Sequence, residues 1–203
     1  MLRIASLLRL WVAAACCWAL GAAAQAPEVT DARVYPVEEG LALDADFSFE
    51  LTPRLADVLK NGVPLYFVVE FEMTRYRWYW FDETAASTQM QQRLSYHPLS
   101  RQYRLSSGPL QQNFASLEEA LNVLRRVRKW IIVDRTTSFS DADYEAGVRL
   151  RLDTTLLPKP FQVSALMARD LHLETPWKRF VVRSPRQLPA PVESREPKGA
   201  EDR

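Results

Sequence analysis

LALDADFSFEL, residues 41–51, is the stretch of sequence that decides the fold class. The odd positions hold the apolar residues Leu41, Leu43, Ala45, Phe47, Phe49 and Leu51, and the even positions hold Ala42, Asp44, Asp46, Ser48 and Glu50. Successive side chains of a strand point to opposite faces of a sheet, so this alternation predicts a strand with one buried face and one wet face. Half-buried strands of this kind are typical of antiparallel sheets.

Residues 63–81 carry the longest strand pattern, and the phase of that pattern changes partway along it. Apolar side chains stand at odd positions as far as Met73 and at even positions from Tyr76, whereas Arg75 and Arg77 are odd. A strand cannot exchange its two faces without an extra residue or a bend. We therefore expect a β-bulge or kink between Met73 and Tyr76. The alternative is two strands that belong to different sheets.

Turn residues separate the remaining strand patterns. Residues 97–100, HPLS, are expected to close a hairpin between Ser87–Tyr96 and Arg101–Ser106. Further strands are expected at Pro27–Val34, Leu110–Phe114, Trp130–Asp134 and Tyr144–Leu152, with one or two more within Leu171–Val182. Many short strands joined by turns favour a single, mainly antiparallel β-domain, most simply a sandwich, over a parallel α/β sheet. The alternative is an α+β open sheet with a helix packed on one face.

Two helices are predicted from their capping residues. Thr52 followed by proline is typical of a helix start and Gly62 of a helix stop, which predicts a short helix over Pro53–Lys60. Ser116 is followed three residues later by a glutamate, which is the spacing of a capping box. Apolar residues then recur at helical spacing, and the basic residues near position 129 would interact well with the negative end of a helix dipole. This pattern predicts a longer helix over Leu117–Lys129.

The first 26 residues have the three parts of a secretory signal peptide. Arg3 and Arg9 supply the positive start, Leu10–Leu20 is uncharged and apolar, and small residues dominate Gly21–Ala26. Ala24-Gln25-Ala26 fits the A-x-A pattern, which predicts cleavage after Ala26, with cleavage after Ala24 as a second option. A membrane span needs about 20 apolar residues, so we expect a periplasmic mature protein without a transmembrane span.

Two other interpretations of this segment are kept. An uncleaved segment would tether the protein to the inner membrane, because Ala22–Ala24 extend the apolar run to about 15 residues, which is still short of a full span. Cys16 or Cys17 would otherwise be a lipid-attachment site, although Ala13–Ala15 lack the large aliphatic residue usual before such a cysteine.

The rest of the chain has the size of one domain followed by a tail. Removal of residues 1–26 leaves 177 residues, which is enough to bury a hydrophobic core. We expect residues 27–184 to form this β-rich periplasmic domain. Residues 185–203 mix prolines and charges with few apolar residues, and this composition predicts a disordered tail.

Charge and cysteine content exclude several classes of function. The formal net charge of the chain is +1, and loss of Arg3 and Arg9 would bring it near −1, so we expect no binding of nucleic acid. Cys16 and Cys17 are the only cysteines, and both lie in the signal segment. The mature protein therefore has no cysteine for a disulfide, a thiolate metal site or nucleophilic catalysis.

The predicted binding surface lies on two strands. Arg75 and Arg77 on one strand, and Arg149 and Arg151 on another, would form a basic stripe if these strands pair. Together with Tyr79, these four arginines make up the surface that we expect to contact an anionic headgroup, a polysaccharide or an acidic protein. Charged residues are also ordinary on the wet face of a strand, so a solvated face is the alternative.

The aromatic run Trp78–Phe81, followed by Asp82 and Glu83, is the densest constellation in the chain. We interpret the two tryptophans as core residues and the two carboxylates as the start of a solvated turn. An aromatic platform for a sugar or a peptide is the alternative.

No residue pattern indicates catalysis, a metal or a cofactor. His97 stands in a turn and His172 between two leucines, and neither has a carboxylate at metal-motif spacing, so both are expected at the surface. The chain has no G-x-S-x-G elbow, no P-loop and no G-x-G-x-x-G. We therefore predict that the protein is not an enzyme and needs no cofactor.

Four segments together resemble a proteobacterial family of exported proteins, domain of unknown function 4390, whose members are sometimes described as proline-rich signal peptide proteins. The segments are residues 78–83, 96–103, 114–121 and 148–163, the last with its LPKPFQ run. The resemblance spans nearly the whole mature domain and implies a Gram-negative, envelope-located protein. Genes of this family often lie beside one for a membrane sensor kinase, which implies a role in signalling or in the envelope. The family brings no known catalytic residues.

These observations favour a non-enzymatic periplasmic binding or interaction module that acts with an envelope or membrane protein partner, such as a membrane sensor. The alternative is a carrier of a small apolar or lipid ligand in an aromatic pocket, and an enzyme of unknown class is third. A deep apolar cavity would favour the carrier, whereas an open surface would favour the protein partner. The sequence itself does not specify the oligomeric state.

Overall fold

The computed structural model describes residues 26–75, 83–137, 139, 142–162 and 169–183. The segments expected to be the signal peptide and the tail therefore lie outside the described residues, as do residues 76–82 with the two tryptophans of the aromatic run. No helix within the described part of the chain is long and apolar enough to cross a membrane.

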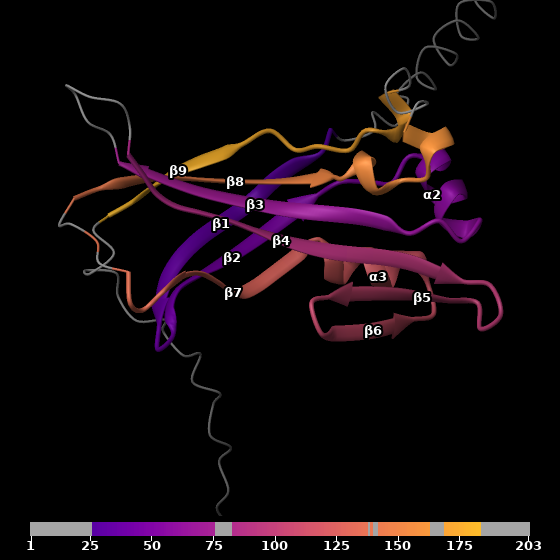
Figure 1. Ribbon diagram of the computed structural model, residues 1–203, viewed down its shortest axis with the longest axis horizontal. Helices are drawn as coiled ribbons and strands as arrows, with labels where there is room; N and C mark the ends of the chain where they lie inside the picture. The colour runs from indigo at the N-terminus through magenta and orange to yellow at the C-terminus, as the bar shows by residue number, and fades with distance from the viewer. Residues whose placement is uncertain (1–25, 76–82, 138, 140–141, 163–168, 184–203) are drawn as a thin grey trace, which may run out of the picture.

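Two antiparallel sheets make up most of the fold (Figure 1). The smaller sheet has the order β1 (Glu28–Val37), β2 (Gly40–Ser48) and β7 (Arg126–Asp134). The larger sheet has the order β6 (Leu110–Phe114), β5 (Gln102–Ser107), β4 (Glu83–His97), β3 (Leu65–Arg75), β8 (Tyr144–Leu152) and β9 (Lys178–Val182). Every strand pairing is antiparallel, which confirms the prediction of a mainly antiparallel, sandwich-like β-domain.

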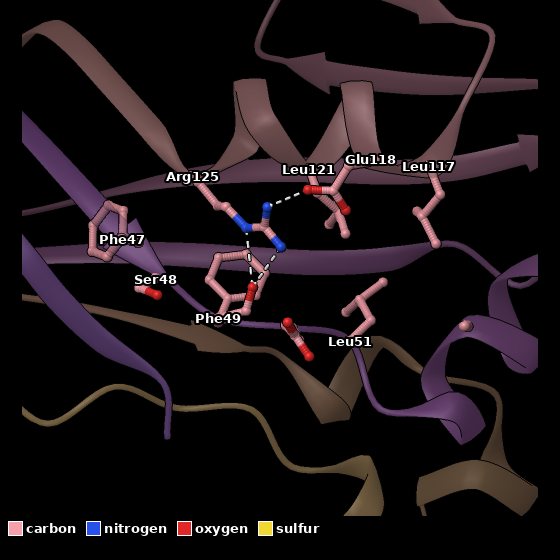
Figure 2. Close-up of a pocket in the computed structure, with 10 residues that line it drawn as sticks. Phe47, Ser48, Phe49, Leu51, Leu117, Glu118, Leu121 and Arg125 are labelled. Carbon is pink, nitrogen blue, oxygen red and sulfur yellow. Dashed lines mark hydrogen bonds and ion pairs between the residues drawn. The ribbon is translucent and has the colours of Figure 1, made fainter. Parts of the chain in front are cut away.

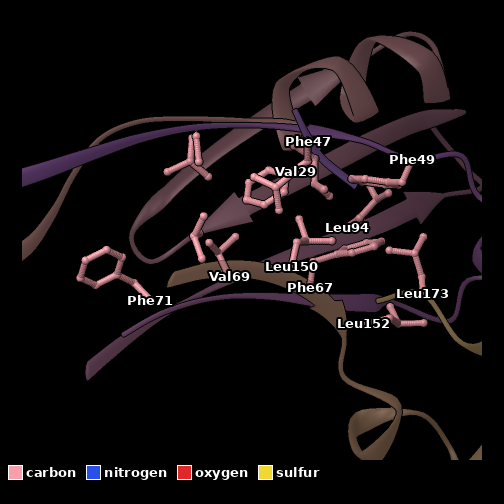
Figure 3. Packing of buried hydrophobic residues seen from close by; sticks show 14 of the residues in the cluster. Val29, Phe47, Phe49, Phe67, Val69, Phe71, Leu94, Leu150, Leu152 and Leu173 are labelled. Carbon is pink, nitrogen blue, oxygen red and sulfur yellow. The ribbon is translucent and has the colours of Figure 1, made fainter. Parts of the chain in front are cut away.

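The hydrophobic core lies between the two sheets (Figure 3). Phe67 and Val69 of β3 point to the same side as Leu150 of β8, because Val69 and Leu150 are register partners. Phe47 and the residue after β2, Phe49, approach from the smaller sheet, and the rings of Phe49 and Phe67 stack with their centroids 5.9 Å apart. The period-two pattern of the sequence thus places its apolar residues on the inner faces of both sheets.

The short helix α2 spans Pro53–Lys60, as the capping residues predict. The Thr52 hydroxyl accepts a hydrogen bond from the Leu55 amide at 3.2 Å and donates one to the Asp170 carbonyl oxygen at 2.5 Å. The N-cap residue therefore also ties α2 to the short 3₁₀ turn Arg169–Leu171.

The second helix, α3, spans Leu117–Leu124 and begins at the predicted capping box. The Ser116 hydroxyl accepts from the Glu119 amide at 3.2 Å, and the Glu119 carboxylate accepts from the Ala115 amide at 3.2 Å. Its buried residues, which are Ala120, Leu121 and Leu124, join the same core, and Figure 1 shows α3 beside β7 and behind the strands of the larger sheet.

The prediction that this helix continues to Lys129 is wrong, because β7 begins at Arg126. Val127, which fits the helical pattern, is buried in the smaller sheet as the register partner of Ala45. Lys129 has a positive φ of 48° at a register shift in β7, and its amide donates to Asp44 at 2.9 Å. Pairing with β2 therefore overrides the helical periodicity of these residues.

A β-bulge is present where the phase change predicts one. Met73 pairs with Ala86 of β4, but the next residue of β3, Thr74, pairs with Thr84, so Ala85 is an extra residue on β4. The bulge thus lies at the predicted place, but its additional residue is on the partner strand, and β3 keeps its phase through Thr74 in its pairing with β8. The residues from Tyr76, where the phase of the pattern changes, lie outside the described residues. The predicted hairpin is confirmed, since β4 and β5 pair from Gln92↔Ser107 to His97↔Gln102.

Candidate functional site

Two of the predicted arginines, Arg149 and Arg151, lie together on the outer face of the larger sheet, where both contact Glu70. β3 and β8 pair as expected, and Glu70 is the register partner of Arg149. Arg149 Nε donates to one Glu70 carboxylate oxygen at 2.6 Å, and Arg151 Nε donates to the other at 2.7 Å. A second carboxylate, that of Glu174, accepts from Arg149 Nη1 at 2.6 Å. The pair is therefore the centre of a mixed-charge network rather than a basic stripe.

The Glu70 carboxylate stays ionised in this network. Burial alone would raise its pKa, but the hydrogen bonds from Arg151 and Arg149 outweigh that effect and hold the pKa of Glu70 below its usual value. The carboxylate and the two guanidinium groups thus satisfy one another within the sheet.

Trp177 shares this outer face. The Arg149 guanidinium lies 4.6 Å from the centroid of its ring, and a Cβ built on Gly147 would lie 3.1 Å from the indole. The glycine therefore allows the indole to pack closely on β8. Nearby, Arg179 bridges Glu145 at 3.0 Å and Glu72 at 3.4 Å. The charges of this face are paired across strands, which is an arrangement that stabilises a sheet.

The structure does not bring Arg75 into this group. Arg75 is in phase with Phe71 and Met73, so it lies on the opposite face of the sheet from Arg149 and Arg151. Arg77 and Tyr79 lie outside the described residues. Of the five residues of the predicted surface, the structure places only Arg149 and Arg151 side by side.

Both histidines are exposed, as predicted. His97 ends β4 at a turn, and His172 lies between the buried Leu171 and Leu173. Within the described ranges, no three residues of the metal-ligating types His, Cys, Asp and Glu come together.

A better candidate site is an open groove between α3 and the chain segment that leads from β2 to α2 (Figure 2). We call it the α3 groove. Its volume is about 550 Å³, and it is lined by Phe47, Ser48, Phe49, Glu50, Leu51, Ala56, Leu117, Glu118, Leu121 and Arg125.

Arg125 fastens the two walls of the α3 groove to each other. Its Nε and Nη2 donate to the carbonyl oxygen of Phe49 at 3.0 Å and 2.7 Å, and its Nη1 donates to Glu118 at 2.7 Å. The guanidinium also lies 5.5 Å from the centroid of the Phe49 ring. Only 18% of the Arg125 side chain is exposed. The donors of Arg125 are engaged within the protein. Arg125 therefore maintains the shape of the groove, and the residues around it are the ones available to contact a ligand.

The α3 groove is lined by apolar side chains, and each of its two walls carries one carboxylate. Leu51 and Leu117 are half-buried and face each other across it in Figure 2. Glu50 and Glu118 are exposed, and Glu118 is neutralised by Arg125. Glu50 makes no hydrogen bond or ion pair with any residue that the structure describes. An unneutralised carboxylate beside apolar side chains attracts a basic group that is adjacent to an apolar one.

A second hollow, of about 400 Å³, adjoins the α3 groove at Phe47 and Arg125. Arg126 and Arg128 line it, and Arg128 pairs with Asp46 at 2.6 Å. Arg126 is exposed, and the described part of the chain offers it no carboxylate within ion-pair distance. The two hollows together run from the acidic Glu50 to the basic Arg126.

Sequence reasoning did not identify this site. Arg125 and Phe49 are 76 residues apart in the chain, and no local pattern links them. One local signal was present, since Glu118 and Arg125 are seven residues apart and thus lie two helical turns from each other. The predicted helix through Lys129 concealed this signal, because Arg125 was then interpreted as a residue that interacts with the helix dipole.

The model of a protein family described as "Domain of unknown function (DUF4390)" matches residues 24–181. The matched span includes both hollows and all of the two sheets except the last residue of β9. No curated protein and no solved structure matches the chain.

Proposed function

The chain belongs to the DUF4390 family, and we propose that it is a non-enzymatic periplasmic binding module that holds a segment of an envelope or membrane protein in the α3 groove. The observation that carries this proposal is the open α3 groove, lined by Glu50, Leu51 and Leu117, together with the adjoining hollow, lined by Arg126. A site of this shape and polarity suits a polypeptide segment.

The interior of the protein supports a partner protein over a lipid carrier. Large side chains such as Phe67, Phe71 and Leu150 fill the space between the sheets and are almost completely buried. The α3 groove opens to solvent and has charged residues at its rim. A carrier encloses most of the surface of its ligand in an apolar cavity, whereas a protein partner needs an accessible surface with a polar rim.

The chemistry of the groove specifies the segment that fits it. A lysine or arginine would pair with Glu50, an apolar side chain would lie between Leu51 and Leu117, and a carboxylate would pair with Arg126. The signal-peptide pattern of residues 1–26 supports a periplasmic location, and the family resemblance supports a membrane sensor as the partner.

Site-specific photo-crosslinking in intact cells tests this proposal. With a photoreactive amino acid in place of Leu51, we expect a discrete adduct with one envelope protein, mapped to a segment with a basic residue next to an apolar one. Adding Glu50→Lys should reduce the adduct about ten-fold through like-charge repulsion. Glu39→Lys, an identical change in the exposed turn between β1 and β2, should leave it unaltered.

The same photoreactive group at Leu99 gives the background, because this turn residue is 98% exposed and lies outside the α3 groove. Labelling from position 51 no stronger than from position 99, or labelling insensitive to Glu50→Lys, would contradict the proposal. A small lipid adduct from position 51 would instead support a carrier.

A further inference from the structure

The edges of the two sheets differ in how they are protected against pairing with another strand. A strand at the edge of a sheet has unpaired backbone groups, and proteins usually block them with charges, proline or bulges. The edge strand β1 contains Asp31, Arg33 and Pro36, and β9 contains Lys178 and Arg179. The third edge strand, β7, contains several basic residues and register shifts.

The fourth edge strand, β6, lacks every one of these protections. Its sequence is LQQNF, without charge or proline, and its register with β5 runs unbroken from Ser107↔Leu110 to Tyr103↔Phe114. All of its residues except Phe114 are exposed, and Leu110 is 68% exposed. Figure 1 shows β6 as the outermost strand of the larger sheet on that side.

We infer that β6 pairs with β6 of a second copy of this chain, antiparallel and about a two-fold axis through Gln112. In this register Leu110 lies opposite Phe114 of the second copy, Gln111 lies opposite its Asn113, and Gln112 lies opposite its Gln112. Each residue thus meets one of its own chemical kind, apolar with apolar and amide with amide. A two-fold interface requires self-complementarity of this type.

The inner face of the paired strands is complementary as well. Leu110, Gln112 and Phe114 follow the inner face of β5, because Gln112 is the partner of Leu105 and Phe114 that of Tyr103. Dimerisation would therefore cover Leu110 and extend the apolar inner face from one copy to the next.

The formal net charge of the chain is only +1, so two copies repel each other little. A strand of five residues buries a small area, and we expect a dissociation constant on the order of micromolar.

Sedimentation of the protein, expressed as the full chain and purified from cells, tests the inference. Between about 1 and about 200 μM, the mass should rise from that of the monomer toward that of the dimer. Gln112→Lys places two like charges opposite each other at the axis and should weaken the dimer about ten-fold or more. Gln91→Lys adds the same charge at an exposed position of the interior strand β4 and should have no effect.

Disulfide trapping tests the register. Opposed residues of an antiparallel pair have Cα atoms about 4.5–5.5 Å apart, which a disulfide can bridge. In a chain with Cys16→Ser and Cys17→Ser, Gln112→Cys should give a covalent dimer on mild oxidation. Gln111→Cys alone should do so poorly, but should cross-link to a chain with Asn113→Cys.

A protein that stays monomeric across this concentration range would overturn the inference. So would a dimer that Gln112→Lys leaves intact, or cross-linking that is equally efficient at positions 111 and 112. A folded circular dichroism spectrum of Gln112→Lys shows that a loss of dimer is not a loss of fold.

Discussion

At the scale of single residues, Asp44 is the side chain that joins all three strands of the smaller sheet. It stands on β2 and is 8% exposed. Its Oδ1 accepts from the Tyr35 hydroxyl of β1 and from the Lys129 amide of β7, both at 2.9 Å. Its Oδ2 accepts from Arg33 Nη2 at 2.8 Å. Burial alone would raise the pKa of Asp44, but these hydrogen bonds outweigh it and hold the pKa below its usual value.

We predict that Asp44→Asn destabilises the protein by about 1.5–3 kcal/mol, because it replaces a charged acceptor of several donors with a neutral amide. Urea unfolding at neutral pH measures the change. The matched control is Asp46→Asn on the same strand, which removes a more exposed ion pair with Arg128 and should cost about 1 kcal/mol or less. Equal losses in the two variants would contradict the role assigned to Asp44.

Asp44 also shows what alternation alone can predict at the residue scale. The pattern of residues 41–51 correctly buries Leu41, Leu43, Ala45 and Phe47. It places Asp44 on a wet face, yet this residue is buried beneath its partners from β1 and β7. No local pattern contains that information, since the Lys129 amide that caps the carboxylate is 85 residues away.

At the scale of elements, the prediction succeeded where the signal is local. Thr52-Pro53 and the Ser116–Glu119 box correctly predict where α2 and α3 begin, and β8 has the bounds that its alternation predicts. It failed where a distant partner decides the structure. Val127 satisfies both a helical and a strand pattern, and only the presence of β2 beside it selects the strand. Tertiary pairing overrides local propensity at such positions.

The start of β2 depends on a glycine. Gly40 has a φ of +146°, and a Cβ there would lie 2.0 Å from the carbonyl oxygen of Val133 on β7. We predict that Gly40→Ala lowers the free energy of unfolding by about 2 kcal/mol or more, through backbone strain and displacement of β7 from β2.

Gly62 supplies the matched control for this prediction. Its φ of +84° is also positive, but nothing lies within 4 Å of a Cβ built there. Gly62→Ala should therefore cost about 1 kcal/mol, the strain alone. Thermal or urea unfolding of both variants measures the difference, and a Gly40→Ala protein as stable as Gly62→Ala would refute the contact with β7.

At the scale of the whole molecule, the candidate site arises from the way distant segments meet. The α3 groove combines the end of β2, the segment before α2 and the first and last turns of α3. The sequence contained each segment but no signal for their association, so the predicted site rested on strand alternation and consisted of Arg75, Arg77, Tyr79, Arg149 and Arg151. In the structure, Arg149 and Arg151 are paired with Glu70, and Arg149 is also paired with Glu174.

The stability of the two sheets depends on pH in the same way. Asp44 joins the strands of the smaller sheet and Glu70 joins β3 to β8 in the larger one, and both carboxyls have a lowered pKa in the folded protein. A carboxyl with a lowered pKa contributes stability that is present above its unfolded pKa, about 3.9 for Asp and about 4.3 for Glu. That contribution is lost as the pH falls through the lower folded pKa. Both sheets therefore weaken within the same acidic window.

We predict that the melting temperature of the protein is nearly constant from pH 7 to about pH 5 and falls steeply below about pH 4. In the double variant Asp44→Asn with Glu70→Gln, the melting temperature at pH 7 should be lower, and its decline below pH 4 shallower, because two of the linked protons are gone. The control variant Glu38→Gln with Glu39→Gln removes two exposed carboxylates from the turn between β1 and β2 and should follow the wild type. Thermal unfolding monitored by circular dichroism at each pH gives the three curves.

If the double variant lost stability in parallel with the wild type, other carboxyls would control the acid transition. The assignment of the acid transition to Asp44 and Glu70 would then be wrong.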